Sequence, residues 1–359
     1  MKVSSISLKQ AMAAVSRTSN SRSTLPILGH VCIAPSEKGI ELATTNLEQM
    51  IVVEIETDSI DWQSMTVDAS LFAKFINELP DKPIELTQKN GRLYVECSGF
   101  KANFPTMDGA DFPLIEYPTS DGFTMTAADF SSMVNLVTFA ASQNIAQPTL
   151  QGINLVIEAG HAIIAATDGT RLSVLNLDVD APDCNMIIPS TALASFMAIA
   201  KGQGKITVIP GDGHIWMMAG NIRMKSQLIT ARYPDYNGII PKAADQEAEV
   251  NAMELRQALR SVQVLAGGNN LINCFWESDA LFLEATSQES GEAKAAIPAK
   301  AEMSRFDFFI NGRYLMDIVG SAESVVILRG TTASRPIVFE IDGMKNFLHL
   351  IMPMSMENE

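Results

Sequence analysis

The sequence predicts an α+β protein made of three repeated units, each with two helices and about eight short strands in antiparallel sheets. Three features recur in the same order in each unit: a first helix, a second helix, and an aromatic- or methionine-proline pair. In the first helices apolar residues recur at i, i+4 and i+7, which places them on one helix face. These residues are Leu8, Met12 and Val15, then Phe130, Val134 and Val137, and then Leu255, Leu259 and Val262.

The second helix and the closing pair keep a similar spacing. The second helices carry Leu71, Phe72, Phe75 and Ile76, then Leu193, Phe196 and Met197, and then Tyr314, Leu315, Ile318 and Val319. The closing pairs are Phe112-Pro113, Tyr233-Pro234 and Met352-Pro353. Because ordered features that recur along a chain indicate a structural repeat, we expect domains at residues 1–122, 123–246 and 247–359. A length of 359 residues suits two or three domains.

Local signals place the elements of the first unit. Asn90-Gly91 is a strong hairpin signal, and the prolines at 80 and 83 end the second helix. The expected order is a strand at 3–6, a helix at 7–18, a polar loop at 20–24, strands from 27, at 40–44 and at 49–57, a helix at 69–79, and strands at 84–88, 92–97 and 100–104.

The second and third units follow the same plan. The second unit has a strand at 123–125, a helix at 127–141, a loop at 142–148, strands at 152–158, 161–167 and 171–179, a helix at 190–200, and strands between 206 and 228. The third unit starts at 249 and ends with a strand at 347–352.

One turn differs between the repeats. Thr167-Asp168-Gly169 is a turn signal between two strands, and the stretch 43–52 is its copy in the first unit, with Thr45 in the place of Thr167. The first unit has Asn46-Leu47-Glu48-Gln49 where the second has Asp168-Gly169-Thr170-Arg171. Repeats that differ at one surface stretch indicate that one copy has acquired a function.

Charge and composition limit the functional classes. The net charge of −15 argues against a protein that binds nucleic acid over its outer surface, although a locally basic inner face stays compatible with it. No apolar run of about 18 residues is present, and the N-terminus lacks the apolar core of a signal peptide, so we expect a cytosolic protein without membrane contact. The four cysteines show no CxxC spacing, so we expect reduced, partly buried thiols rather than a zinc site or disulfides.

Catalytic motifs are scarce. The sequence contains no GxxxxGK[ST], HExxH or GxSxG, and the four histidines have no ligand spacing, so we expect no metal and no cofactor. Asp168 beside Arg171 allows an acid–base pair as an alternative, but a turn carboxylate and a rim arginine explain the two residues better, since no second carboxylate or nucleophile is fixed nearby.

Four strings within the repeat carry a family resemblance: TLPILG at Thr24, ATDGTRL at Ala166, YPDY at Tyr233 and MPM at Met352. In this order they resemble the bacterial DNA polymerase sliding clamp, the beta subunit of replicative DNA polymerase III, over nearly the whole chain. The resemblance implies a protein that is not an enzyme. Two chains would form a head-to-tail ring whose helices line a hole around duplex DNA. The implied partners are a DNA polymerase, a clamp loader and other proteins with clamp-binding motifs.

A clamp needs cations that face the hole, but a closed ring holds DNA by topology, so weak contacts suffice. The candidates are Lys9, Arg22, Lys201, Lys205, Arg256 and Arg260. Ser190-Thr191 stands where the family usually carries basic residues, and residues 144–149 lack its aromatic pair, so DNA contact is expected to be weaker or differently placed.

The resemblance also implies an apolar groove between the second and third domains that binds extended peptides with leucine or phenylalanine anchors. The matching positions are Leu150, Thr167, Gly169, Thr170, Arg171, Leu172, Pro234, Ile239, Asn311, Tyr314, Met352, Pro353 and Met354. Thr170 replaces a frequent histidine and Gly238 a frequent arginine, which affects peptide preference more than the location of the groove.

For the dimer, the resemblance places an edge strand of the first unit against the third unit of the other chain. Phe104 would meet Val264 and Leu265, and Lys101 would face Glu289 or Glu292. Two alternatives stay open from the sequence: a divergent clamp-like scaffold from a mobile element or a paralogue, and an α+β enzyme that uses Asp168.

Overall fold

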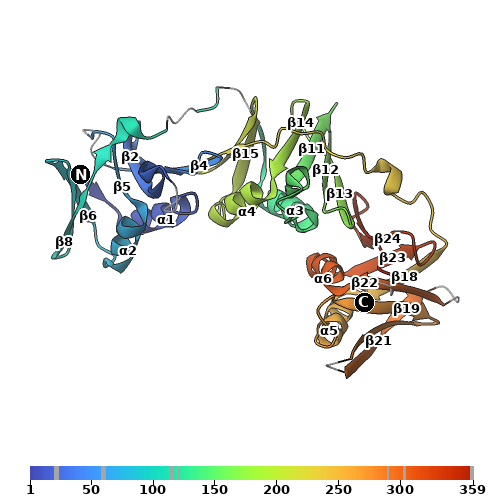
Figure 1. The fold of residues 1–359 in the computed structure, drawn as a ribbon. Helices are drawn as coiled ribbons and strands as arrows, with labels where there is room; N and C mark the ends of the chain where they lie inside the picture. The colour runs from blue at the N-terminus through green and yellow to red at the C-terminus, as the bar shows by residue number, and fades with distance from the viewer. Residues whose placement is uncertain are drawn as a thin grey trace. The chain divides into compact units, whose positions relative to one another are not determined.

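The computed structural model describes residues 1–19, 24–57, 62–113, 117–119, 122–288, 291–301 and 305–355 (Figure 1). Two predicted site residues, Arg22 and Glu289, lie outside these ranges. The described α-helices are α1 (Ser5–Val15), α2 (Ala69–Glu78), α3 (Ala127–Val137), α4 (Ser190–Ile199), α5 (Ala252–Gln263) and α6 (Gly312–Ser321). Two fall in each predicted repeat, which confirms the α+β class with two helices per repeat.

Contacts group the chain into two compact units, and each is described by itself. The first unit contains residues 1–131 and 191–228, and the second contains 132–190 and 229–359. The predicted second repeat is therefore shared between the two compact units. The division at residues 122 and 246 stays a prediction from the sequence.

The first compact unit holds two antiparallel sheets. One has the order β1 (Lys2–Val3), β6 (Ile84–Lys89), β7 (Arg92–Cys97) and β8 (Phe100–Pro105). The other has the order β10 (Phe123–Thr126), β15 (Lys205–Pro210), β16 (His214–Ala219), β17 (Ile222–Gln227), β4 (Gln49–Glu56), β3 (Gly39–Thr45), β2 (His30–Ser36), β5 (Met65–Asp68) and β9 (Met107–Asp108).

The second compact unit is built on one long antiparallel sheet. Its order is β14 (Cys184–Pro189), β11 (Gly152–Glu158), β12 (His161–Thr167), β13 (Arg171–Asp178), β25 (Phe347–Ile351), β24 (Ile337–Ile341), β23 (Val325–Gly330), β18 (Gln246–Asn251), β21 (Gly291–Ala301), β20 (Ala280–Ser287), β19 (Leu271–Glu277) and β22 (Phe306–Asn311). Short 3-10 helices include η1 (Pro26–Gly29), η3 (Thr138–Ala140), η4 (Pro148–Gln151) and η5 (Asn237–Ile239).

Sheets of neighbouring repeats join at two matched strand pairs. We call the β4–β17 pair the first seam and the β13–β25 pair the second seam. Gln49 lies opposite Ser226 in the first seam, and Arg171, its counterpart in the second repeat, lies opposite Ile351 in the second seam. Each seam thus starts at the turn that the sequence comparison singled out.

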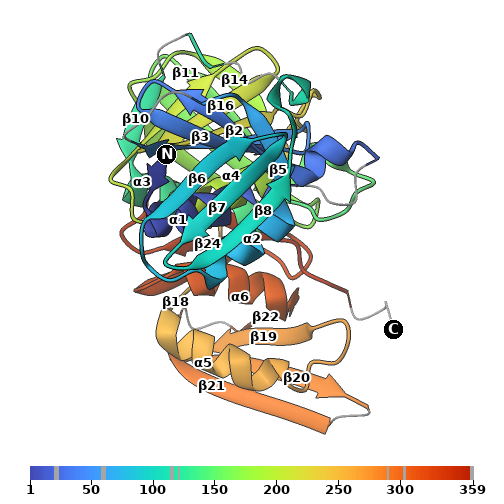
Figure 2. The same cartoon turned by 90° about the vertical axis from the view of Figure 1, so that its left-hand side faces the viewer.

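The helices bury the faces that the sequence predicts. All nine residues expected on the apolar faces of the first helices are at most 3% exposed. In the first compact unit α1 packs on β4 and against α2 (Figure 1). In the second, α5 packs against α6 and on β20 and β21 (Figure 2). The prediction that Leu71 is buried is wrong. Leu71 is 58% exposed, because the buried face of α2 runs through Phe72 and Ile76.

One helix and one strand begin at a different residue than predicted, because a capping side chain or a 3-10 turn determines where each begins. Helix α1 begins at Ser5 rather than at residue 7, because the Ser4 side chain accepts a hydrogen bond from the Ser7 N–H as an N-cap. The strand expected from residue 27 begins at His30, since Pro26 starts the 3-10 turn η1. No helix in the described part of the chain is long and apolar enough to cross a membrane.

The four cysteines match the expected small, buried thiols. Cys32, Cys97 and Cys274 are buried, Cys184 is half-buried, and all are free. Burial raises the pKa of the Cys32 thiol to about 11, which keeps it protonated at neutral pH.

Candidate functional site

The turn between β12 and β13 is closed by its own side chains. Oδ1 of Asp168 accepts hydrogen bonds from the backbone N–H groups of Thr170 and Arg171 and from the Thr170 hydroxyl. The Thr167 hydroxyl donates to the Arg171 carbonyl oxygen at 2.6 Å and accepts from the Gly169 N–H at 3.0 Å. These bonds hold the turn rigidly, and they occupy the carboxylate that a catalytic role would need free.

The copy of this turn in the first repeat has the same threonine hydrogen bonds but different residues at its surface. The Thr45 hydroxyl donates to the Gln49 carbonyl oxygen at 2.8 Å and accepts from the Leu47 N–H at 3.0 Å. Leu47 has φ +74° where Gly169 has φ +92°, and a left-handed backbone favours glycine. A Cβ at Gly169 would meet nothing within 4 Å, so the second-repeat turn presents bare backbone to an approaching ligand.

Arg171 joins this turn to helix α6 of the third repeat. Its Nε donates to Oδ2 of Asp168 at 2.9 Å, and its Nη1 donates to Oδ2 of Asp317 at 2.5 Å. The guanidinium lies 4.2 Å from the ring centre of Tyr314 and 5.8 Å from that of Phe139, within the range of cation–π attraction. The Arg171 side chain is only 10% exposed, so most of it is packed between the turn and helix α6.

The C-terminal segment runs along the same turn. The Met352 N–H donates to the Thr170 carbonyl oxygen at 2.8 Å, and the Met354 N–H donates to the Phe309 carbonyl oxygen on β22 at 2.8 Å. Met352 is 41% exposed. The backbone hydrogen bonds fix the segment, while the flexible side chain of Met352 stays partly exposed.

The segment that leads into the third repeat also contacts the 167–172 turn. The Tyr233 hydroxyl accepts from the Thr167 N–H at 3.0 Å, and burial raises the pKa of the Tyr233 phenol. Tyr236 and Ile240 pack on a cluster of Ala165, Leu172, Val174, Val338 and Leu350. Leu172, one of the predicted groove positions, is therefore 1% exposed and packs beneath Tyr236 and Ile240.

Behind the turn, the second seam contains a buried histidine. His349 on β25 lies opposite Ser173 on β13, with 2.8 Å between Nδ1 and the serine hydroxyl. Its ring contacts Phe139 at 5.1 Å and Phe339 at 6.2 Å. Burial, with the charge of Arg171 as the second cause, lowers the pKa of His349 to about 3, so the ring is neutral.

The other predicted groove positions are placed less directly. Pro234 and Ile239 are exposed next to Tyr233 and Ile240, which contact the turn and the cluster beneath it. Asn311 caps helix α6, accepting from the Arg313 N–H at 2.9 Å. Leu150 accepts from the Ser142 N–H through its carbonyl oxygen, and no described bond links it to the turn.

Two predicted DNA-facing cations make structural contacts. The ammonium of Lys9 donates to the Leu79 carbonyl oxygen at 2.6 Å and to Asp81 at 2.9 Å. Arg256 donates to the carbonyl oxygens of Val319 at 2.9 Å and Ala322 at 2.8 Å. The predicted cations Lys201, Lys205 and Arg260 are exposed, as are Arg17, Lys74 and Arg313, which sequence reasoning did not single out.

The described members of the predicted dimer interface lie on β8, on β21 and directly after α5. Lys101 pairs with Glu96 on the neighbouring strand at 2.8 Å, and Glu292 pairs with Lys294 at 2.9 Å. Phe104 is half-buried because its ring packs on Phe72 at 5.4 Å and Phe75 at 5.7 Å. Val264 is 77% exposed, whereas Leu265 is half-buried.

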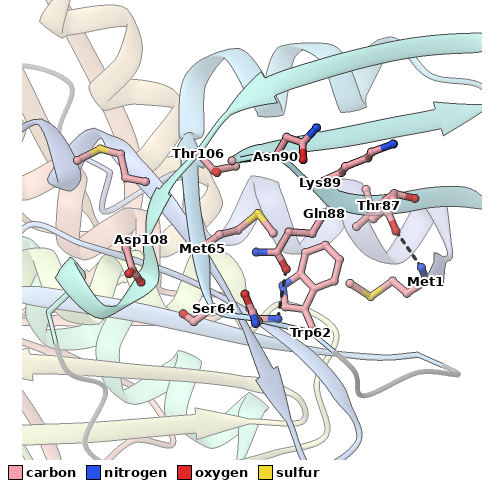
Figure 3. Close-up of a pocket in the computed structure, with 14 residues that line it drawn as sticks. Met1, Trp62, Ser64, Met65, Thr87, Gln88, Lys89, Asn90, Thr106 and Asp108 are labelled. Atoms are coloured by element: carbon pink, nitrogen blue, oxygen red, sulfur yellow. Dashed lines mark hydrogen bonds between the residues drawn. The ribbon is translucent and has the colours of Figure 1, made fainter.

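A separate cavity of about 720 Å³ opens in the first compact unit (Figure 3). Trp62, Met65, Gln88 and Lys89 are among its lining residues, and the Met1 ammonium beside it donates to the Leu86 carbonyl oxygen at 2.8 Å. None of the predicted site residues that the structure describes is among those that line it. In the described ranges, His, Cys, Asp and Glu form no group of three or more that could hold a metal ion.

Sequence reasoning missed Asp317, Tyr233 and Tyr236. Tyr233 and Tyr236 belong to the YPDY string that was noted for its resemblance, but a string gives no contact partner. Asp317 follows Tyr314 by three residues, which places both on one helix face. That spacing was the only available signal for Asp317.

Sequence models of the three domains of one family match the chain in order. They are the DNA polymerase III beta subunit N-terminal domain at residues 1–116, the central domain at 124–235 and the C-terminal domain at 237–355.

Relatives and solved structures agree with these matches. A beta sliding clamp of Pseudomonas aeruginosa is 24% identical over 343 residues, and one of Staphylococcus aureus is 26% identical over 353 residues, each covering 93% of both chains. A crystal structure of the P. aeruginosa sliding clamp bound to griselimycin has a TM-score of 0.93 at 22% identity, covering 99% of both chains. The Bacillus subtilis sliding clamp has a TM-score of 0.92 at 21% identity, covering 99% of this chain and 98% of that one. Since matched domain models account for nearly the whole chain, this protein belongs to the DNA polymerase III beta subunit family of sliding clamps.

Proposed function

We propose that this protein is the processivity factor of a replicative DNA polymerase, a homodimeric ring that encircles duplex DNA in the cytoplasm and acts without a cofactor. The match of all three family domains in order is the observation that carries this proposal. The three-domain division at 1–122, 123–246 and 247–359 is part of it. Nothing in the relatives favours a mobile-element scaffold or an enzyme that uses Asp168.

The partner surface in this proposal is the groove around the 167–172 turn. This surface would use the bare backbone at Gly169 and the exposed side chains of Met352 and Ile239, together with Arg171. A peptide with two apolar anchors that buries roughly 300 Å² gains at most several kcal/mol at about 25 cal/mol per Å² before ordering costs, so we expect micromolar affinity. Its natural sources are the polymerase, the clamp loader and other proteins with clamp-binding motifs.

Two strand edges support the proposed dimer. In the described pairings β8 is bonded only to β7. Strand β21 bonds to β20 through residues 291–298, and its other edge bonds to β18 only from Ala299 onward. A second copy could therefore pair its β8 with the open stretch of β21, with Phe104 and Lys101 near Val264, Leu265 and Glu292.

The groove is tested by peptide binding to a Met352→Asp, Met354→Asp double variant. The backbone bonds of both residues survive these changes, whereas a charge at Leu172 would be buried and would disrupt the fold. We expect loss of binding to a fluorescent peptide with leucine and phenylalanine anchors, with the dimer intact. Met344→Asp is the matched control, since Met344 is a 37% exposed methionine outside the groove. Unchanged affinity in the double variant would place the groove elsewhere.

A further inference from the structure

The single positive charge of Arg171 faces two negatively charged carboxylates. Asp168 accepts a hydrogen bond from Nε of the guanidinium at 2.9 Å, and Asp317 accepts one from Nη1 at 2.5 Å. The two carboxylates come from different repeats, the first from the turn and the second from α6. One cation facing two anions leaves this place with a formal charge of −1.

Asp317 also fixes where the guanidinium lies. It follows Tyr314 by three residues on α6, so the carboxylate and the ring share a helix face. The guanidinium is held 4.2 Å from the Tyr314 ring centre, with the arginine side chain 10% exposed and the Asp317 side chain 40% exposed. The pair is therefore partly shielded from solvent, where charge-assisted hydrogen bonds are stronger than on an open surface.

We propose that Asp317 is a positioning and specificity-determining residue of the groove. It holds Arg171 over the Tyr314 ring and balances its charge, so the groove selects peptides by their apolar anchors and disfavours an acidic side chain near Arg171. A free arginine at the same place would attract acidic peptides instead. This inference rests on the proposed partner groove and adds the residue that sets its charge preference.

The test compares labelled peptides that share two apolar anchors and differ at one position between them, which is serine, glutamate or lysine. Fluorescence anisotropy on the full chain gives a Kd for each peptide. For the unaltered protein we expect the lysine peptide to bind at least as tightly as the serine peptide, and the glutamate peptide to bind more weakly. This ranking requires no variant, and preference for the glutamate peptide would overturn the proposal.

The variants then separate positioning from general stability. In Asp317→Asn, which keeps the side-chain shape, the Kd ratio of glutamate to serine peptide should fall by about tenfold, the effect of one charged hydrogen bond. Asp317→Glu should restore the original ratio. The matched control is Glu340→Gln, because Glu340 shares Arg329 with Glu247 as Asp317 shares Arg171 with Asp168, and it should leave the ratio unchanged.

Two results would contradict the inference in distinguishable ways. An unchanged ratio in Asp317→Asn, including an equal loss of affinity for both peptides, would show that Asp317 has a structural role only. Binding of none of the peptides by the unaltered, dimeric protein would overturn the partner groove itself, and the proposal with it.

Discussion

The ammonium of Lys9 on α1 donates to the carbonyl oxygen of Leu79, the C-cap residue of α2, at 2.6 Å. The third repeat has the same arrangement: Arg256 on α5 donates to the carbonyl oxygen of Ala322, the C-cap residue of α6, at 2.8 Å. Lys9 follows Leu8 and Arg256 follows Leu255, so the two cations occupy matched repeat positions. Carbonyl groups at a helix C-terminus lack hydrogen-bond partners within the helix, and a cationic side chain can donate to them. Its positive charge also interacts favourably with the negative end of the helix dipole.

Replacing either cation should therefore destabilise the fold. We predict that Arg256→Met lowers the free energy of unfolding by about 1–2 kcal/mol, since a charged donor to two half-buried carbonyls is lost. Arg260→Met on the same helix is the matched control, because Arg260 is exposed, and it should change stability by less than about 0.5 kcal/mol. Urea denaturation measures both. Equal effects would contradict the capping role, and any DNA-binding defect of Lys9 or Arg256 variants has to be compared with their stability.

The buried His349 should make the fold sensitive to acid. Its folded-state pKa of about 3 lies below the unfolded value of 6.5, so its contribution is present above pH 6.5 and is lost as the pH falls toward 3. The slope from this group approaches about 1.4 kcal/mol per pH unit. His349→Asn should be less stable at neutral pH but lose less stability on acidification, as measured by urea denaturation across that range. The exposed His161→Asn is the control, and an unaltered slope in His349→Asn would contradict the prediction.

Glu41 should act in the opposite direction. Burial raises its pKa, against the hydrogen bond that Tyr117 donates to it and the charge of Arg223. Tyr117, from the segment between the first two repeats, stacks on Trp216 at 6.1 Å, so this cluster covers the first seam. A raised folded-state pKa stabilises the fold at low pH, and this contribution is lost as the pH rises through that pKa.

We therefore predict that Glu41→Gln gains stability relative to the unaltered protein as the pH rises from about 4 to about 8. Thermal melting across that range measures the difference. Glu56→Gln, an exposed carboxylate on β4, is the control. A constant difference between Glu41→Gln and the unaltered protein would show that the carboxyl does not titrate abnormally.

The dimer should depend on apolar contact at the end of α5. Exposed ion pairs such as one with Lys101 contribute only about 0.2–1 kcal/mol, whereas Val264 offers a 77% exposed apolar side chain. We predict that Val264→Asp or Leu265→Asp gives monomers at micromolar concentration in sedimentation. Met253→Asp, at a 74% exposed methionine on the same helix, should stay dimeric. Phe104 is a less selective probe, since its ring also packs on Phe72 and Phe75 of its own domain.

Periodicity was sufficient to predict the buried faces of the first helices, because each face depends on residues within one helix. Periodicity failed to predict the exposure of Leu71, because the apolar residues of this helix are compatible with two overlapping helix faces. The contacts of Lys9 with Leu79 and of Arg171 with Asp317 join residues 70 and 146 positions apart. No local pattern predicts such contacts, and they decide which charges stay available for partners. The burial of Leu172 beneath Tyr236 and Ile240 was missed for the same reason.

Retention on DNA tests the central claim most directly. The protein, loaded by a clamp loader onto nicked circular DNA, should co-elute with the circle in a gel-filtration column at high salt. Cutting the circle once should release it, because a ring slides off a free end. Direct binding to a short linear duplex should be weak and fall with salt, as expected for a chain of net charge −15. Retention on the cut DNA equal to that on the circle, or tight and salt-resistant binding to the short duplex, would contradict a sliding clamp.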